Sequence, residues 1–94
     1  DCIMRIKFPY HTPIPKHLGK VIKNVRKKQG MTQQDLADNT GTSAKFISDV
    51  ERGKETVQID KVFDLIRALN LKIYVTDKPL VEEETNGKAF DFLG

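Results

Sequence analysis

The stretch that decides the fold is Gln33–Arg52, QQDLADNTGTSAKFISDVER. Its pattern predicts two short helices joined by a sharp corner at Gly41, where a left-handed backbone carries no Cβ penalty. Ser43 suits the N-cap of the second helix because its side-chain oxygen can accept from backbone N–H groups that lack partners. The inner sides of the two helices are marked by apolar residues, with helical spacing in the second: Leu36, Ala37, Phe46, Ile47 and Val50.

Two helices that cross closely at a small residue are typical of the helix-turn-helix that reads DNA. The stretch resembles this motif in the phage repressor and Cro-like (XRE) family. The matching residues are Thr32, Gln33, Leu36, Ala37, Gly41, Ile47, Val50, Glu51, Arg52 and Gly53. Thr40 and Thr42 depart from the family pattern, in which both flanks of the corner glycine are usually aliphatic, and this predicts a slightly looser corner. The alternative interpretation is an ordinary helical hairpin in an all-α core.

Length and composition favour one small domain with short appendages. The chain has 94 residues and a formal net charge of +3, but the charge is unevenly distributed. Residues 1–76 hold 14 Lys and Arg against 8 Asp and Glu, whereas residues 77–94 hold 2 against 5. A basic body with an acidic tail is typical of a nucleic-acid-binding protein whose tail has a separate role.

Several classes of protein are disfavoured by what the sequence lacks. Cys2 is the single cysteine, and no group of Cys and His has metal-ligand spacing, so we expect no metal and no cofactor. The sequence has no phosphate-binding glycine loop, no nucleophile with a base and no paired carboxylates in apolar surroundings, which predicts a protein that is not an enzyme. With no signal peptide and no long apolar run, we expect a cytoplasmic bacterial protein that is nucleoid-associated by DNA binding.

The predicted organisation has three parts: an extended N-terminal arm at 1–15, a helix-turn-helix domain at 16–76 and a flexible acidic tail at 77–94. The first helix is expected from Pro15 or Lys16 to Gln29, with a buried stripe of Leu18, Val21, Ile22 and Val25. A fourth helix is expected from about Val57 to Leu69, capped by Thr56. Its predicted core face consists of Ile59, Val62, Phe63, Ile66 and Leu69, with Leu65 on the flank. Asn70 suits the left-handed position that ends it.

Residues 71–76, LKIYVT, alternate apolar and polar side chains and predict a strand. Leu71, Ile73 and Val75 would then form its apolar, dimerising face. A lone strand leaves its backbone unpaired, so it must pair either with its symmetry mate or with residues 3–8. A strand directly after the fourth helix resembles the HipB-type antitoxins, whose strands pair across the dimer two-fold axis. The fold class is therefore mainly α: a lambda-repressor-like bundle of four helices plus a strand that pairs in the dimer.

The residues expected to contact DNA lie at the starts of the two motif helices and just beyond them: Thr32, Gln33, Gln34, Ser43, Ala44, Lys45, Ser48 and Lys54. Lys45 is long enough to reach guanine O6 and N7, or a phosphate in a different register. The family resemblance implies that Gln33 binds a phosphate beside the helix N-terminus. Asp49 is expected to point sideways. The resemblance also implies a structural ion pair between Arg26 and Glu51.

The acidic tail is predicted to be disordered when free, because it is too polar to bury a core. Phe90, Phe92 and Leu93 near its end indicate a short motif that docks on a protein partner. The alternative is a frayed terminus with incidental apolar residues.

Together these patterns predict a dimeric repressor that binds a palindromic operator in double-stranded DNA. The resemblance to HipB implies the antitoxin of a HipA-kinase-type operon, which binds the toxin and autoregulates the shared promoter. One alternative is a stand-alone XRE-family regulator, such as a prophage or restriction–modification controller. A second is an interaction module in which the helix-turn-helix binds protein only.

Overall fold

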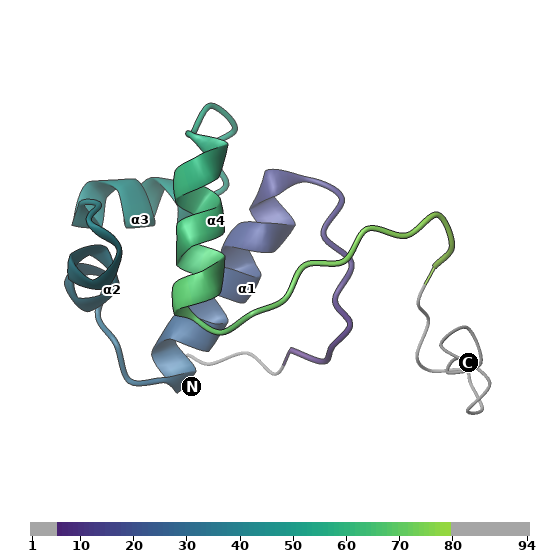
Figure 1. Ribbon diagram of the computed structural model, residues 1–94, viewed down its shortest axis with the longest axis horizontal. Helices are drawn as coiled ribbons and strands as arrows, with labels where there is room; N and C mark the ends of the chain where they lie inside the picture. The colour runs from purple at the N-terminus through teal and green to yellow at the C-terminus, as the bar shows by residue number, and fades with distance from the viewer. Residues whose placement is uncertain (1–5, 80–94) are drawn as a thin grey trace.

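Four helices form the body of the protein in the computed structural model, which describes residues 6–79. They are α1 (Pro15–Lys28), α2 (Gln33–Thr40), α3 (Ala44–Glu51) and α4 (Ile59–Ala68). Helices α2 and α3 lie on the same side of α4, and the chain after α4 leads away from the helices (Figure 1). The mainly α, four-helix fold predicted from the sequence is confirmed.

Short polar side chains fix where the two motif helices begin. Thr32 and Asp35 form a capping box: the Asp35 N–H donates to Thr32 Oγ1 at 3.0 Å, and the Thr32 N–H donates to Asp35 Oδ2 at 3.0 Å. Ser43 Oγ accepts from the Phe46 N–H at 3.1 Å at the start of α3. Gly41 has the left-handed φ of 68° that the corner between the helices requires. Local sequence thus determines both ends of the turn.

The two threonines beside the corner glycine satisfy their own hydroxyls. Thr40 Oγ1 donates to the Leu36 carbonyl at 2.9 Å and lies 2.9 Å from Thr42 Oγ1. Both hydroxyl groups beside the corner therefore have hydrogen-bond partners. This explains how the motif tolerates threonine at positions where its family usually has aliphatic residues.

The hydrophobic core lies where all four helices meet. Its buried members are Ile22, Leu36, Ala37, Ile47, Val50, Val62, Leu65, Ile66 and Leu69. On α4 the prediction was partly wrong, because Leu65 is fully buried while Ile59 and Phe63 are 69% and 44% exposed. The residues of α4 that face the core follow the helical spacing 62, 65, 66 and 69, so positions 59 and 63 fall on a neighbouring face.

The start of α4 also differs from the prediction. Thr56 lies in the loop, and the N-cap position is Gln58, whose side chain makes no capping hydrogen bond. At the other end Asn70 adopts the expected left-handed conformation, with φ 65°. The Leu71 N–H then donates to the Ile66 carbonyl at 2.9 Å, which completes the helix C-terminus.

The predicted strand at 71–76 is not formed in the single chain. Within residues 6–79 no segment is assigned to a strand, and beyond Leu71 the chain is irregular. The physical reason is that a strand requires a second strand to pair with, and the described part of the N-terminal arm does not provide one. Ile73 and Val75 consequently remain exposed, at 47% and 96%.

Two predicted features, the alternative N-terminal hairpin and the docking motif of the tail, involve residues outside the described range. Residues 1–5, which include Ile3 of the alternative hairpin, lie outside the described residues. So do residues 80–94, with the predicted docking residues Phe90, Phe92 and Leu93.

Candidate nucleic-acid interface

The outer side of α3 carries side chains that the sequence analysis predicts to contact DNA. Lys45 extends from the first turn with its side chain 80% exposed, and Ser43 just before it is also exposed. Ala44 and Ser48 are partly exposed on the same helix. Ile47 is fully buried beneath them and joins α3 to the core. The structure thus brings Ala44, Lys45 and Ser48 onto one short helix, with Ser43 as its N-cap.

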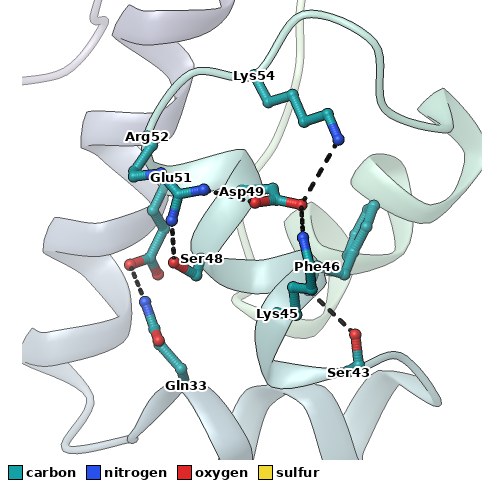
Figure 2. A network of polar contacts seen from close by, with 9 residues as sticks. All are labelled: Gln33, Ser43, Lys45, Phe46, Ser48, Asp49, Glu51, Arg52 and Lys54. Atoms are coloured by element: carbon teal, nitrogen blue, oxygen red, sulfur yellow. Dashed lines mark hydrogen bonds and ion pairs between the residues drawn. The ribbon is translucent and has the colours of Figure 1, made fainter.

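The start of α2 contributes a second group of polar residues. Thr32 and Gln34 are exposed there, and the Gln34 amide donates to Asp38 Oδ1 at 2.9 Å. Gln33 differs from the expectation, because its amide turns inward and donates to Glu51 Oε1 at 3.1 Å (Figure 2). The backbone N–H groups in the first turn of a helix have no carbonyl four residues back, which makes this end suitable for a phosphate.

Arg26 and Glu51 form a buried, bidentate ion pair between α1 and the end of α3. Arg26 Nε lies 2.6 Å from Glu51 Oε2, and Arg26 Nη2 lies 3.0 Å from Glu51 Oε1. The side chains are only 6% and 3% exposed. Arg26 Nη1 also donates to the Met31 carbonyl at 2.8 Å, just before α2 begins. A single guanidinium therefore ties α1, the start of the motif and the end of α3 together.

Asp49 is the residue whose role the sequence interpretation missed. Its side chain is 10% exposed, and three cations converge on it (Figure 2). Lys45 Nζ lies 3.2 Å from Oδ2, Lys54 Nζ lies 3.8 Å from Oδ2, and Arg52 Nη2 lies 2.6 Å from Oδ1. The pairs of Asp49 with Lys45 and Arg52 could have been predicted, because these residues lie four and three positions from Asp49, the spacing of neighbours on a helix surface. Lys54, which follows the helix, needed the structure.

The environment of Asp49 favours its ionised form. The hydrogen bond from Lys45 lowers the pKa of the Asp49 carboxyl below its ordinary value. Burial opposes this shift, while the charges of Lys45, Lys54 and Arg52 lower the pKa further. Because a lowered pKa leaves the group charged throughout the neutral range, the cluster of Asp49, Lys45, Arg52 and Lys54 contains one negative and three positive charges there.

Other kinds of site do not stand out in the described residues. Between residues 6 and 79 no three His, Cys, Asp or Glu side chains gather in a way that could hold a metal ion. Over the same range no helix is long and apolar enough to cross a membrane.

Comparisons with known proteins agree with the helix-turn-helix interpretation. A family model described as helix-turn-helix, HTH_3, matches residues 22–75. An uncharacterized HTH-type transcriptional regulator of Sinorhizobium fredii, y4mF, is 39% identical over 59 residues, covering 63% of this chain and 78% of that protein. An endothelial differentiation-related factor 1 homolog of Gallus gallus is 36% identical over 73 residues, 76% of this chain. The match covers 49% of the chicken protein, so the chain spans about half of its length.

Solved structures of other proteins share this fold. A chain in the solved structure of a HipA-HipB-O2-O3 complex matches with a TM-score of 0.68 and 26% identity, covering 73% of this chain and 97% of that one. The restriction–modification controller protein C.AhdI of Aeromonas hydrophila matches with a TM-score of 0.56 and 26% identity, covering 62% and 84%. With its capped turn, its buried Arg26–Glu51 pair and a family match over more than half of its length, the chain belongs to the helix-turn-helix family of XRE-type regulators.

Proposed function

We propose that this protein is a sequence-specific DNA-binding repressor that inserts α3 into the major groove. The observation that supports this most directly is the exposed polar side of α3, held rigidly by Ile47 below it and by the Arg26–Glu51 pair at its end. In this motif the N-terminal residues of the second helix contact the base edges. Lys45 is the side chain with the reach and charge to hydrogen-bond guanine O6 and N7.

The remaining residues are assigned by their positions. Ser43 and Ser48 supply short hydrogen-bonding groups, and Ala44 contacts a thymine methyl group. Thr32, Gln33 and Gln34 hold a phosphate at the start of α2, where for Gln33 the backbone N–H is the main donor because its side chain is bonded to Glu51. Lys54 contacts the DNA backbone of the same half-site. Phosphate contacts fix the register, and contacts from α3 then provide the sequence preference.

We further propose that the protein acts as a homodimer through residues 71–76. A strand with an unpaired edge exposes a row of backbone N–H and C=O groups, and a second copy would satisfy them. The exposed apolar residues Ile73 and Val75, with Ile59 and Phe63 on α4, supply surface for a second copy to cover. Such pairing would place two copies of α3 about one helical turn of DNA apart, roughly 34 Å, and so would require an operator with inverted half-sites.

For the biological role we favour the antitoxin of a HipA-kinase-type operon that also represses its own promoter. The support is the match to nearly the whole chain of a protein solved in complex with HipA and DNA. The acidic tail, through Phe90, Phe92 and Leu93, is the proposed docking segment for the kinase. The alternative is a stand-alone regulator, including a restriction–modification controller, since one such controller shares the fold. A HipA-type kinase gene next to this one would favour the antitoxin, whereas a restriction endonuclease gene would favour the controller.

Lys45→Ala and Gln33→Ala test the assignment of the DNA-facing residues. We expect Lys45→Ala to weaken binding to a preferred duplex by about 1–3 kcal/mol and to relax the preference at one base pair, because a base contact is lost. Gln33→Ala keeps the backbone N–H that is the proposed phosphate donor, so its effect should be smaller than that of Lys45→Ala and equal across sequences. The measurement is a mobility-shift titration against the preferred duplex and its single-base variants. Unchanged affinity and preference in Lys45→Ala would show that Lys45 does not read the DNA.

A further inference from the structure

The helix α3, which we propose to lie in the major groove, contains a carboxylate among its cationic side chains. Asp49 is on α3, one turn beyond Lys45, and its two oxygens are shared among Lys45, Arg52 and Lys54 (Figure 2). A negative charge here weakens attraction to DNA, so its presence requires a reason.

We propose that Asp49 determines the specificity of DNA binding by acting as an internal counter-anion that holds Lys45, Arg52 and Lys54 away from phosphates of non-cognate DNA. This inference rests on the proposed DNA-binding function. Asp49 is thus a positioning residue: it acts through the three cations and need not contact a base itself.

The cluster is asymmetric in a way that suits this role. The carboxylate is fixed, because the Asp49 side chain is short and only 10% exposed on a packed helix. The cationic side chains are long and mostly at the surface, with exposures of 80% for Lys45, 66% for Arg52 and 49% for Lys54. The cations can therefore turn towards DNA while the carboxylate remains in place, ionised at neutral pH because its pKa is lowered.

A second contact orders one of the cations. Arg52 Nη1 donates to Ser48 Oγ at 2.6 Å while Nη2 binds Asp49, so the guanidinium lies along the side of α3. The Asp49 carboxylate thus holds the charged groups of Lys45, Arg52 and Lys54 close together. Ion pairs with exposed partners are weak, so a DNA acceptor in the right position can replace the carboxylate.

Cognate and non-cognate DNA should differ in how many of the three cations they draw away from the Asp49 carboxylate. A cognate site presents a base edge to Lys45 and phosphates in register with Arg52 and Lys54, so the gain from all three contacts exceeds the loss of the pairs with Asp49. A non-cognate duplex presents phosphates but no matching base edge, and the cations then stay partly neutralised by Asp49. The carboxylate would therefore reduce non-specific binding more than specific binding.

The experiment compares Asp49→Asn with two other variants of the full chain. Asp49→Asn removes the charge with almost no change of shape. Asp49→Glu keeps the charge and should preserve the wild-type behaviour. Asp64→Asn is the matched control, since it removes an equal charge from an exposed Asp64–Arg67 pair on α4. Each protein is titrated, between 50 and 300 mM NaCl, with a duplex selected by the wild type from a random library and with a scrambled duplex of equal composition.

For binding of Asp49→Asn to the scrambled duplex, we expect a steeper slope of log K against log [salt]. The slope should steepen by about 0.9 for each cation that is released from Asp49 and contacts a phosphate. The affinity of Asp49→Asn for this duplex at 100 mM NaCl should rise by about three- to eightfold, because one full phosphate contact is worth about eightfold between 1 and 0.1 M salt. The ratio of specific to non-specific affinity should fall by a similar factor.

The inference is overturned if Asp49→Asn matches Asp64→Asn in slope and ratio, or if Asp49→Glu behaves as Asp49→Asn. If Asp49→Asn loses preference at one base pair without a change of slope, Asp49 reads a base and the counter-anion role is wrong. Should Asp49→Asn fail to fold, as judged by circular dichroism, Asp49→Ser, which also removes the charge, takes its place in the same comparison. A wild type with no preference for any duplex would instead reject the proposed function itself.

Discussion

Replacing Arg26 by alanine is expected to lower the free energy of unfolding by about 3–5 kcal/mol, because it leaves a buried carboxylate without its cation. The Glu51 side chain is 3% exposed, and after the replacement only the Gln33 amide would remain bonded to it among the contacts described above. Since small domains are stable by only about 5–15 kcal/mol, this loss would remove a large share of the total stability. Urea denaturation followed by circular dichroism measures the change.

The matched control is Arg67→Ala, which breaks an exposed pair with Asp64 and should cost about 0–1 kcal/mol. The double variant Arg26→Met/Glu51→Leu should recover part of the loss, because an apolar pair of similar volume leaves no buried charge. A double-mutant cycle across Arg26 and Glu51 with negligible coupling energy would contradict the importance of the pair.

The second large effect is expected at Gly19, where α1 passes directly over the end of α3. A Cβ atom at this position would lie 2.4 Å from the Val50 carbonyl oxygen and 2.7 Å from that of Glu51. Both neighbours are backbone atoms, so the helices would have to move apart. Gly19→Ala should therefore destabilise the protein by about 1–3 kcal/mol.

This expectation is opposite in sign to the usual one, which makes it a sharp test of the packing. Glycine to alanine inside a helix ordinarily stabilises by about 0.5–1 kcal/mol. Lys20→Ala, at the exposed neighbouring position, serves as the control and should change stability by less than about 0.5 kcal/mol. Thermal unfolding with a Gly19→Ala midpoint equal to or above that of the wild type would show that α1 and α3 are not in close contact there.

Local rules were sufficient to predict the helix-turn-helix from the sequence. Thr32, Ser43, Gly41 and Asn70 each act within a few residues of themselves, through a cap or a left-handed backbone, so their roles follow from neighbouring residues alone. The apolar stripe of α1 and the inner side of α3 follow equally from helical spacing.

The parts that the sequence did not predict depend on distant or absent partners. Along the fourth helix, six apolar positions were available for a core face, and only packing against the other helices selected Leu65 over Ile59 and Phe63. The 71–76 segment has the pattern of a strand, but a strand requires a second chain or segment that the described residues do not supply.

The candidate site was likewise predictable only in part. The positions of Lys45 and Ser43 on the outer side of α3 follow from the helical repeat. The inward turn of the Gln33 amide does not, because it depends on Glu51 18 residues away. The cluster around Asp49 needed Lys54, which is brought to the carboxylate by the turn after α3.

The central claim is that this chain reads a DNA sequence through α3 as a dimer. The most direct test is selection from a library of random duplexes by the 94-residue chain, followed by sequencing of the bound fraction. We expect enrichment of an inverted repeat whose half-site centres lie about one helical turn, roughly 34 Å, apart. A bound fraction with the same sequence composition as the input library would contradict the account, because α3 would then make no base-specific contact.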